Sequence, residues 1–476
     1  MRDYIRLPAE ERWPGVQAAL AFLLFCFFMV CPVAPERWND AYSFYGRTLV
    51  AALVVTGLFM RPFGQVIEVK LAALYALWLL LTRILNSDVY MVREPDLVLS
   101  KFLCVSMLAS GLMLNAGQRR RFLNAFCAVI GVFYFISVIP AIVVNLLDTY
   151  FYLPPENVLF GIEDTWHIHY INVFNTNRTI SSLWFYIALC LMVYQLFACK
   201  SRLWRIPIAI AALTFYVAIA LTFSRTVKIV TSVSASMLFM LLALKYLPMK
   251  RLWQKGAALL LCLALFLPLT FKSFDWTTGL MSQVSGLLIS ETTETDSGPT
   301  AGVALSDDRD LKKDISTLSE RGQIFASFAP ALKSEPKRIL IGSFSDKLMN
   351  APNKFVDFPI PFTHMHNFLL EVFMLTGLPG FLLVAAFCLL LVIRMLHLFF
   401  TRNESVTLAD KILTIPLTGI LLYGMFEVVI FTACSDRRGP TDMRELSFFI
   451  IAGLVLACSY DVLPRLRLPG KRNPAS

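Results

Sequence analysis

Long apolar runs alternate with short polar segments along most of the 476-residue chain. A helix that crosses a bilayer needs about 20 mostly apolar residues, and about twelve runs approach that length. They lie at roughly 16–34, 48–63, 69–86, 97–115, 122–147, 179–198, 204–223, 227–247, 255–272, 368–398, 411–433 and 445–463. The pattern predicts an all-α fold, a polytopic transmembrane helical bundle of about twelve spans.

One polar stretch, residues 273–365, is much longer than the other connections. It contains the run "SETTETDSGPTAGVALSDDRD", whose composition is typical of a flexible segment. It continues with "LKKDISTLSERGQIFASFAPALKSEP", which has helical periodicity, and "RILIGSF", which predicts a short strand or a buried turn. We therefore expect three parts: spans 1–9 within 1–272, a partly helical extracytoplasmic (periplasmic-side) cap loop at 273–365, and spans 10–12 with a cytoplasmic tail within 366–476.

The apolar run at 368–398 is unusually long and is interrupted by "TGLPG". Proline and glycine disturb helical hydrogen bonding and geometry. Gly377, Pro379 and Gly380 therefore predict a kink, or a division of the run into a short segment and a full span.

The composition separates this chain from soluble proteins. Charged residues make up 16% and hydrophobic residues 57% of the chain, whereas a soluble domain carries roughly 25% charged residues. The net charge of +10 comes from short Lys and Arg clusters between apolar runs, a pattern that reports membrane topology rather than nucleic-acid binding. The ten cysteines form no C-x-x-C pair, so they indicate neither a disulfide framework nor a zinc site. The sequence predicts an integral membrane protein with no nucleic-acid partner.

The distribution of Lys and Arg between alternate loops predicts an orientation. One set of loops carries about twice as many basic residues as the other, and the richer set is expected in the cytoplasm. Both termini are then cytoplasmic, residues 273–365 lie on the extracytoplasmic face, and the protein is a multi-pass protein of the inner (plasma) membrane. The first apolar run lacks a convincing small-residue cleavage site, which predicts a retained helix. Four of the five histidines fall on the outer side: His167, His169, His364 and His366.

Three arginines stand at predicted helix boundaries on the outer face, against the topological bias. "FNTNRTISSLWFY" contains Arg178, "LTFSRTVKIVTS" contains Arg225, and "SERGQIFASF" contains Arg321. An arginine is always charged and presents a planar fork of donors that matches phosphate, so several converging arginines predict a diphosphate site. The alternative is an arginine that snorkels to the lipid headgroups, and we prefer it for four other basic residues: Lys228, Arg437, Arg438 and Arg444.

The paired histidines of "HIH" at 167–169 and "HMH" at 364–366 leave three possibilities open. They could be metal ligands, although no acidic or cysteine residue nearby completes an obvious shell. They could be structural and bond a loop carbonyl. They could also supply a base, because an unperturbed imidazole with a pKa of about 6.5 takes up a hydroxyl proton near neutral pH.

Together these motifs resemble the signature of the O-antigen ligase and polymerase superfamily. The resemblance lies in "SERGQIF", then "PKRILIGSF", then "FTHMHNFLLEVFMLTGLPGF", with "NTNRT" and "LTFSRTVKI" as two further basic motifs. In that family an outer loop carrying an arginine leads through a Gly turn to a histidine–asparagine pair at the head of a helix. His366 directly precedes Asn367 and matches the motif, so His364 and Asn177, like Asn367, are expected as supporting groups.

The resemblance implies a membrane glycosyltransferase that acts on the outer face and is independent of metals and cofactors. Its donor would be a glycan linked to a polyprenyl (undecaprenyl) diphosphate, and its acceptor the lipid A core of lipopolysaccharide or another glycan. Arg178 and Arg225 would bind the diphosphate, His366 would accept the proton of the attacking hydroxyl, and Arg321 would orient donor or acceptor. Direct displacement would invert the anomeric centre.

Three alternatives remain at the level of the sequence. Ligase and polymerase differ only in the acceptor, and the motifs do not separate them. A glycosidase would need two converging carboxylates, for which we see no outer-face pair. A multi-span transporter or lipid-linked oligosaccharide flippase would carry ionisable residues deep within its spans, where Glu371 and Glu427 are the main examples.

Overall fold

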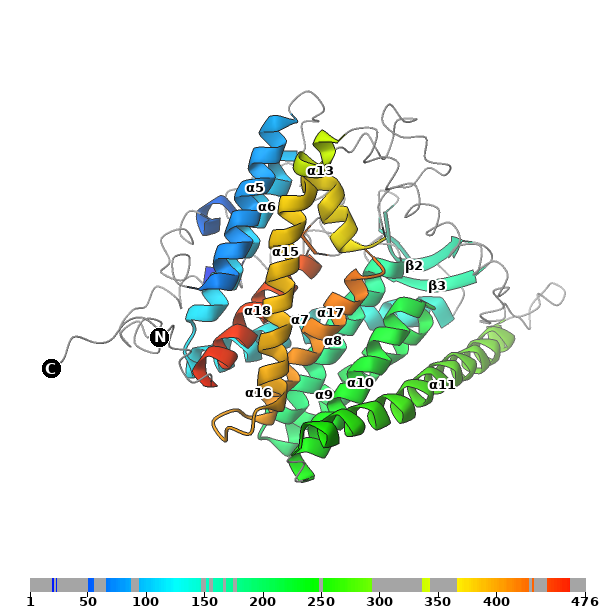
Figure 1. Ribbon diagram of the computed structural model, residues 1–476. Coiled ribbons are helices and arrows are strands. Elements are labelled where there is room, and N and C mark those ends of the chain that lie inside the picture. The colour runs from blue at the N-terminus through cyan, green and yellow to red at the C-terminus, as the bar shows by residue number, and fades with distance from the viewer. Residues whose placement is uncertain are drawn as a thin grey trace.

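The computed structural model of the chain describes a helical bundle (Figure 1). The residues that it describes are 19–20, 23, 50–54, 66–86, 94–146, 151–153, 157–165, 168–173, 178–247, 251–292, 336–342, 366–427, 430–431 and 443–462.

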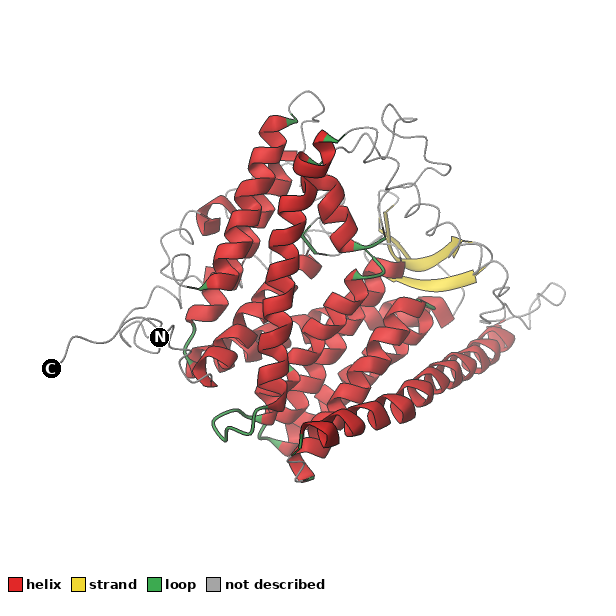
Figure 2. Cartoon of the chain, in the orientation of Figure 1, coloured by secondary structure: helices red, strands yellow, loops and turns green. Residues whose placement is uncertain are grey.

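The described helices run in the following order along the chain. They are α5 (Ile67–Leu85), α6 (Glu94–Met113), α7 (Ala116–Leu146), α8 (Arg178–Ala198), α9 (Arg202–Leu221), α10 (Arg225–Tyr246), α11 (Leu252–Thr292), α13 (Lys337–Ile341), α15 (Phe368–Phe400), α16 (Leu408–Ile412), α17 (Thr414–Gly424) and α18 (Met443–Val462). Three strands, β1 (Phe151–Leu153), β2 (Asn157–Thr165) and β3 (Ile168–Val173), form a small antiparallel sheet in the order β1-β2-β3. Figure 2 shows this sheet at one edge of an otherwise helical molecule.

The all-α polytopic fold class is confirmed. Within the described residues, seven helices are long and apolar enough to cross a membrane, namely α7, α8, α9, α10, α11, α15 and α18. The spans expected from residue 69 onward each coincide with a described helix. Those expected at 16–34 and 48–63 lie largely outside the described residues.

Burial divides the helices into a centre and a periphery. In α18, 83% of the most apolar window is buried inside the protein, against 11% in α11. The central helix packs closely on α6, because Gly111 of α6 faces Gly453 of α18: a Cβ atom added at Gly111 would lie 3.0 Å from the Cα atom of Gly453. Small residues of this kind let two helix backbones approach within a membrane.

The structure differs from the sequence predictions in four places. Helix α11 is 41 residues long and continues to Thr292, so the expected boundary at residue 272 falls inside a helix. Of the two alternatives expected for "RILIGSF", a short strand or a buried turn, the strand is absent from its described residues, which belong to one helical turn, α13, and to Gly342 after it. Helix α17 ends at Gly424, earlier than the span expected at 411–433, and the sheet at 151–173 was not expected.

The kink in α15 is confirmed and has a defined geometry. Gly377 has φ 69° and ψ −171° inside the helix, a conformation that is essentially restricted to glycine. It packs against the backbone of Leu340 in α13, and Gly342, which follows α13 and has φ 68°, packs against the backbone of Leu375. The two parts of α15 meet at a sharp bend beside α13 (Figure 1), and Trp78 of α5 donates to the carbonyl oxygen of Thr376 at 2.7 Å.

A second set of bonds fixes α13 against α5. The Arg338 guanidinium is buried and donates to Oδ1 of Asn86 at 2.7 Å, and Nδ2 of Asn86 donates to the carbonyl oxygen of Ile341 at 3.3 Å. One turn of the predicted cap loop is therefore held tightly against the membrane helices at the bend.

Candidate functional site

The starts of two helices that are distant in sequence meet at the end of α17. Helix α8 begins at Arg178, and the hydroxyl of Ser182, one turn later, lies 3.4 Å from the hydroxyl of Tyr423. Helix α10 begins at Arg225, and the preceding Ser224 also bonds the Tyr423 hydroxyl. The positive ends of two helix dipoles thus lie around one buried tyrosine.

The start of α15 reaches the same place. Nδ1 of His366 lies 3.4 Å from Oε2 of Glu427, and the two side chains are 28% and 15% exposed. Glu427 is one turn beyond Tyr423, because its backbone N–H donates to the Tyr423 carbonyl oxygen at 3.0 Å. The histidine–carboxylate pair is therefore partly open and adjoins the tyrosine that joins α8 to α10.

Asn367 holds this arrangement through both ends of its amide. Its Oδ1 accepts hydrogen bonds from the backbone N–H groups of Leu369 at 3.0 Å and Leu370 at 3.1 Å, which caps the start of α15. Its Nδ2 donates to the carbonyl oxygen of Met425 at 3.1 Å. Asn367 is thus a structural cap that positions His366 against the turn after α17.

Backbone strain is concentrated around this site. Among the described residues, the non-glycine residues with positive φ are Phe223 at 50°, His366 at 49° and Phe431 at 66°. Phe223 lies two residues before Arg225, and Phe431 lies in the segment that follows Glu427. Bulky residues rarely adopt positive φ, and such strain persists where the surrounding structure enforces it, often at functional sites.

Buried hydrogen bonds hold the segment that follows Glu427. The hydroxyl of Tyr75, near the middle of α5, donates to the carbonyl oxygen of Phe431 at 3.0 Å. The N–H of Phe431 donates to Oε1 of Glu445 at 2.6 Å, and Glu445 pairs with Lys101 of α6 in a fully buried ion pair. These bonds fix the backbone of Phe431 and the start of α18 near the His366 segment.

The structure brings some of the predicted site residues together. Arg225 is exposed at the start of α10, and His366 is joined to that helix start through Glu427, Tyr423 and Ser224. The backbone of Arg178 opens α8 at the same end. Arg321, His364 and Asn177 lie outside the described residues.

The expectation of snorkelling is wrong for two basic residues. Lys228 is only 5% exposed, and its Nζ lies 5.7 Å from the ring centroid of Phe223 and 6.0 Å from that of Phe274. Arg444 is 8% exposed and acts electrostatically on Tyr423. Both side chains are therefore enclosed by protein. Arg437 and Arg438 lie outside the described residues.

Sequence reasoning missed Tyr423 and Ser182. It noted Ser224 beside Arg225 and Glu427 within an apolar run, but it did not place them in one site. Glu427 did carry a signal, since it is a carboxylate in an apolar run, but serine and tyrosine in apolar runs are common. Within the described residues, no three His, Cys, Asp or Glu side chains lie together as ligands for a metal ion. His169 lies on β3, where its backbone is paired with Asp164.

The fold and this site define a polytopic membrane protein with two arginine-led helix starts and a histidine–carboxylate pair at one end of α17. Residues 209–385 match a family model described as O-antigen ligase. The match runs from α9 past the bend of α15 and includes both Arg225 and His366. The match covers less than half of the chain, and over that segment the chain is similar to the O-antigen ligase family. A search of curated proteins returned no match.

Proposed function

We propose that the protein is a glycosyltransferase of the O-antigen ligase or polymerase type that acts at the extracytoplasmic face of the inner membrane. It transfers or polymerises a glycan from a polyprenyl-diphosphate-linked donor onto an acceptor hydroxyl. The observation that carries the proposal is the His366–Glu427 contact beside the start of α10. His366 and Arg225 lie inside the segment that matches the family model, and Glu427 follows it.

The diphosphate binds between the starts of α8 and α10. Arg178 and Arg225 supply the guanidinium forks, and the N-terminal ends of the two helices add positive potential. The enclosed charges of Lys228 and Arg444 raise the potential at the same end of the bundle. Together they stabilise the charge that develops on the diphosphate as it leaves.

His366 is the base. Its Nδ1 faces the Glu427 carboxylate, so Nε2 is the nitrogen that accepts the proton, and the carboxylate stabilises the imidazolium that forms. The acceptor oxygen forms a bond to the anomeric carbon, the bond from that carbon to the diphosphate oxygen breaks with its electron pair, and the hydroxyl proton passes to Nε2. Displacement in one step inverts the anomeric centre and needs no metal or other cofactor.

The remaining predicted residues support this step, and two of them, Arg321 and His364, lie in the predicted cap loop. Arg321 orients donor or acceptor, and His364 and Asn177 support the base and the diphosphate arginine respectively. Both termini are cytoplasmic in this orientation, as the Lys and Arg bias predicts.

The direct test is reconstitution. Purified protein is incubated with a polyprenyl diphosphate glycan and either the lipid A core or no second acceptor, and the products are separated on a gel. A glycosylated core identifies a ligase, and a ladder of lengthened donor identifies a polymerase. If neither product forms and the intact donor moves across a vesicle membrane, the protein transports the lipid and the proposed glycan transfer is wrong.

Donor binding tests the diphosphate site separately. Arg225→Ala should weaken binding of the lipid diphosphate at least tenfold, whereas Arg251→Ala is the matched control, because Arg251 is also exposed but precedes α11 at the other end of α10. Equal donor affinity in the two variants would remove Arg225 from the diphosphate site.

A further inference from the structure

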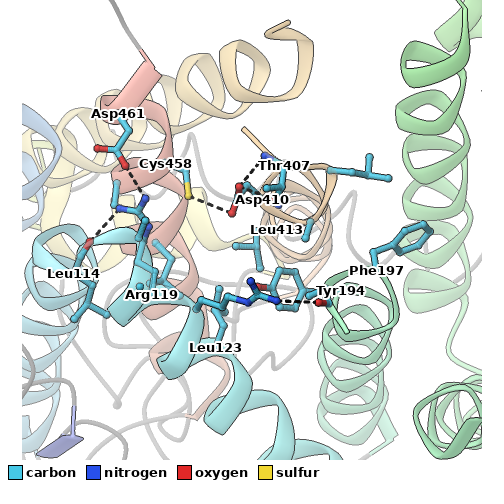
Figure 3. Close-up of a pocket in the computed structure, with 18 of the residues that line it drawn as sticks. Leu114, Arg119, Leu123, Tyr194, Phe197, Thr407, Asp410, Leu413, Cys458 and Asp461 are labelled. Carbon is cyan, nitrogen blue, oxygen red and sulfur yellow. Dashed lines mark hydrogen bonds and ion pairs between the residues drawn. The ribbon is translucent and has the colours of Figure 1, made fainter. Parts of the chain in front are cut away.

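A large cavity lies at the end of the bundle opposite His366. It has a volume of about 1220 Å³ and is lined by the ends of α6, α8 and α18, the start of α7, and the segment that includes α16. Figure 3 shows Arg119 and Leu123 of α7, Tyr194 and Phe197 of α8, and Asp410 of α16 around it. The site described above uses none of these residues.

The lining carries an excess of positive charge. Five basic residues contribute to it: Arg119, Arg120, Lys200, Arg205 and Lys245. Two carboxylates, those of Asp410 and Asp461, also line the cavity, and each is already bonded to a neighbouring residue. Asp461 pairs with Arg119 at 2.6 Å, and Asp410 accepts hydrogen bonds from the backbone N–H and the hydroxyl of Thr407 at 2.9 and 2.7 Å as part of the α16 cap. Four basic side chains therefore face the cavity without a carboxylate partner within the described part of the chain.

Two of these side chains are held in position. The Arg120 guanidinium donates to the carbonyl oxygen of Ala198 at 3.3 Å, and that of Arg205 donates twice to the carbonyl oxygen of Cys199 at 3.1 and 2.9 Å. An arginine has five N–H donors in a fixed fork, so each guanidinium keeps further donors for an anion. The end of α8 thus orients two guanidinium groups before a ligand arrives.

Apolar side chains form another part of the lining, and an apolar wall beside basic groups favours an amphiphile over a small soluble anion. Leu112, Leu123, Phe197 and Leu413 line the same cavity as the basic groups. The cavity lies where helices end, which is the level of lipid headgroups, and basic pockets between helices at such a level suit anionic headgroups. The Lys and Arg bias predicts that this end faces the cytoplasm, where the leaflet contains anionic lipid.

We propose that this cavity binds the phosphate headgroup of an anionic phospholipid, with its acyl chains against the apolar wall. Arg120 and Arg205 hold the phosphate by their remaining donors, and Lys200 and Lys245 contribute charge. This site is separate from the glycan-transfer site and does not depend on the proposed function.

The test measures thermal unfolding of the full-length protein in mixed micelles. Phosphatidylglycerol is added to one arm, phosphatidylcholine to the second, and inorganic phosphate or ATP to the third, because a ligand that binds only the folded state raises the unfolding temperature. The wild type should be stabilised by phosphatidylglycerol alone. Arg120→Gln/Arg205→Gln should bind phosphatidylglycerol at least tenfold more weakly. Arg202→Gln/Arg251→Gln, which removes the same charge from exposed residues outside the cavity, should keep wild-type affinity.

Three results would overturn the proposal: equal stabilisation by the two lipids, equal lipid affinity of the two double variants, or equal protection by inorganic phosphate or ATP, which would assign a soluble anion instead. If Arg120→Gln/Arg205→Gln does not fold, Lys200→Gln/Lys245→Gln replaces it with the same expectation. Native mass spectrometry of the wild type tests lipid preference directly: the protein should retain phosphatidylglycerol in preference to phosphatidylcholine.

Discussion

Replacing Gly377 by alanine should distort the bend of α15 and disable the site. The backbone at this residue has φ 69° and ψ −171°, and holding a non-glycine residue in such a region costs about 1–3 kcal/mol. The added Cβ atom would also lie 2.8 Å from the carbonyl oxygen of Ile339 and closer still to that of Leu340. Forced overpacking of this kind costs typically 1–3 kcal/mol. The variant should therefore lose about 2–6 kcal/mol of folding free energy.

The chain offers a matched control. Gly279 lies within α11, and a Cβ atom added there meets nothing within 4 Å. Alanine in a helix interior is favoured over glycine by roughly 0.5–1 kcal/mol, so Gly279→Ala should be neutral or slightly stabilising. Equilibrium unfolding in mixed detergent micelles measures both variants, and glycan transfer is measured on the same preparations.

Activity separates two roles for the bend. The short first part of α15 connects the bend to His366, so relief of the overlap by movement of this part should shift the imidazole and reduce transfer. A Gly377→Ala protein as stable as Gly279→Ala would refute the backbone reasoning. A destabilised variant with full transfer activity would show that the bend supports the fold without positioning His366.

Three further predictions concern the rest of the site. Lys101→Met leaves Glu445 buried without its partner and should destabilise the protein by about 3–5 kcal/mol, whereas Lys101→Met with Glu445→Gln should recover part of that loss in the same unfolding assay. Asn367→Ala removes a helix cap and a bond to Met425 and should lose about 1–3 kcal/mol and most activity; Asn367→Asp keeps the capping oxygen and should be more stable than Asn367→Ala, and the reverse order would contradict the cap. Treatment with EDTA should leave glycan transfer unchanged, and activity lost to EDTA and restored by a divalent cation would bring a metal into the mechanism.

The helices could be predicted from the sequence because lipid imposes a simple requirement on length and hydropathy. That requirement fails where a helix leaves the membrane. The expected span at 255–272 stops where Lys272 and Asp275 interrupt the apolar run, yet α11 continues through them to Thr292. A helix of this length extends about 60 Å, well beyond a hydrocarbon core of about 30 Å, so polar residues end the predicted span without ending the helix.

The candidate site could be predicted only in part. His366 and Arg225 were expected because histidine and arginine are unusual at the margins of apolar runs. Tyr423 and Ser182 carry no such signal, and their role depends on three-dimensional contact between α8 and α17. The buried position of Lys228 also follows from tertiary packing against aromatic rings, which linear spacing does not reveal.

The "TGLPG" motif shows the same limit at a single position. Glycine and proline predicted that α15 bends. They did not predict that the bend packs against α13 and against Gly342, which lies 35 positions before Gly377 in the chain. Neither the direction of the bend nor the burial of Arg338 beside it can be read from local sequence.

The most direct measurement compares single-turnover glycan transfer by the wild type and by His366→Ala, with donor binding determined on the same samples. If His366 is the base held by Glu427, the alanine variant should bind the lipid diphosphate donor as the wild type does and transfer the glycan about 10²–10⁴-fold more slowly. Transfer at the wild-type rate by a correctly folded His366→Ala protein would contradict the central claim.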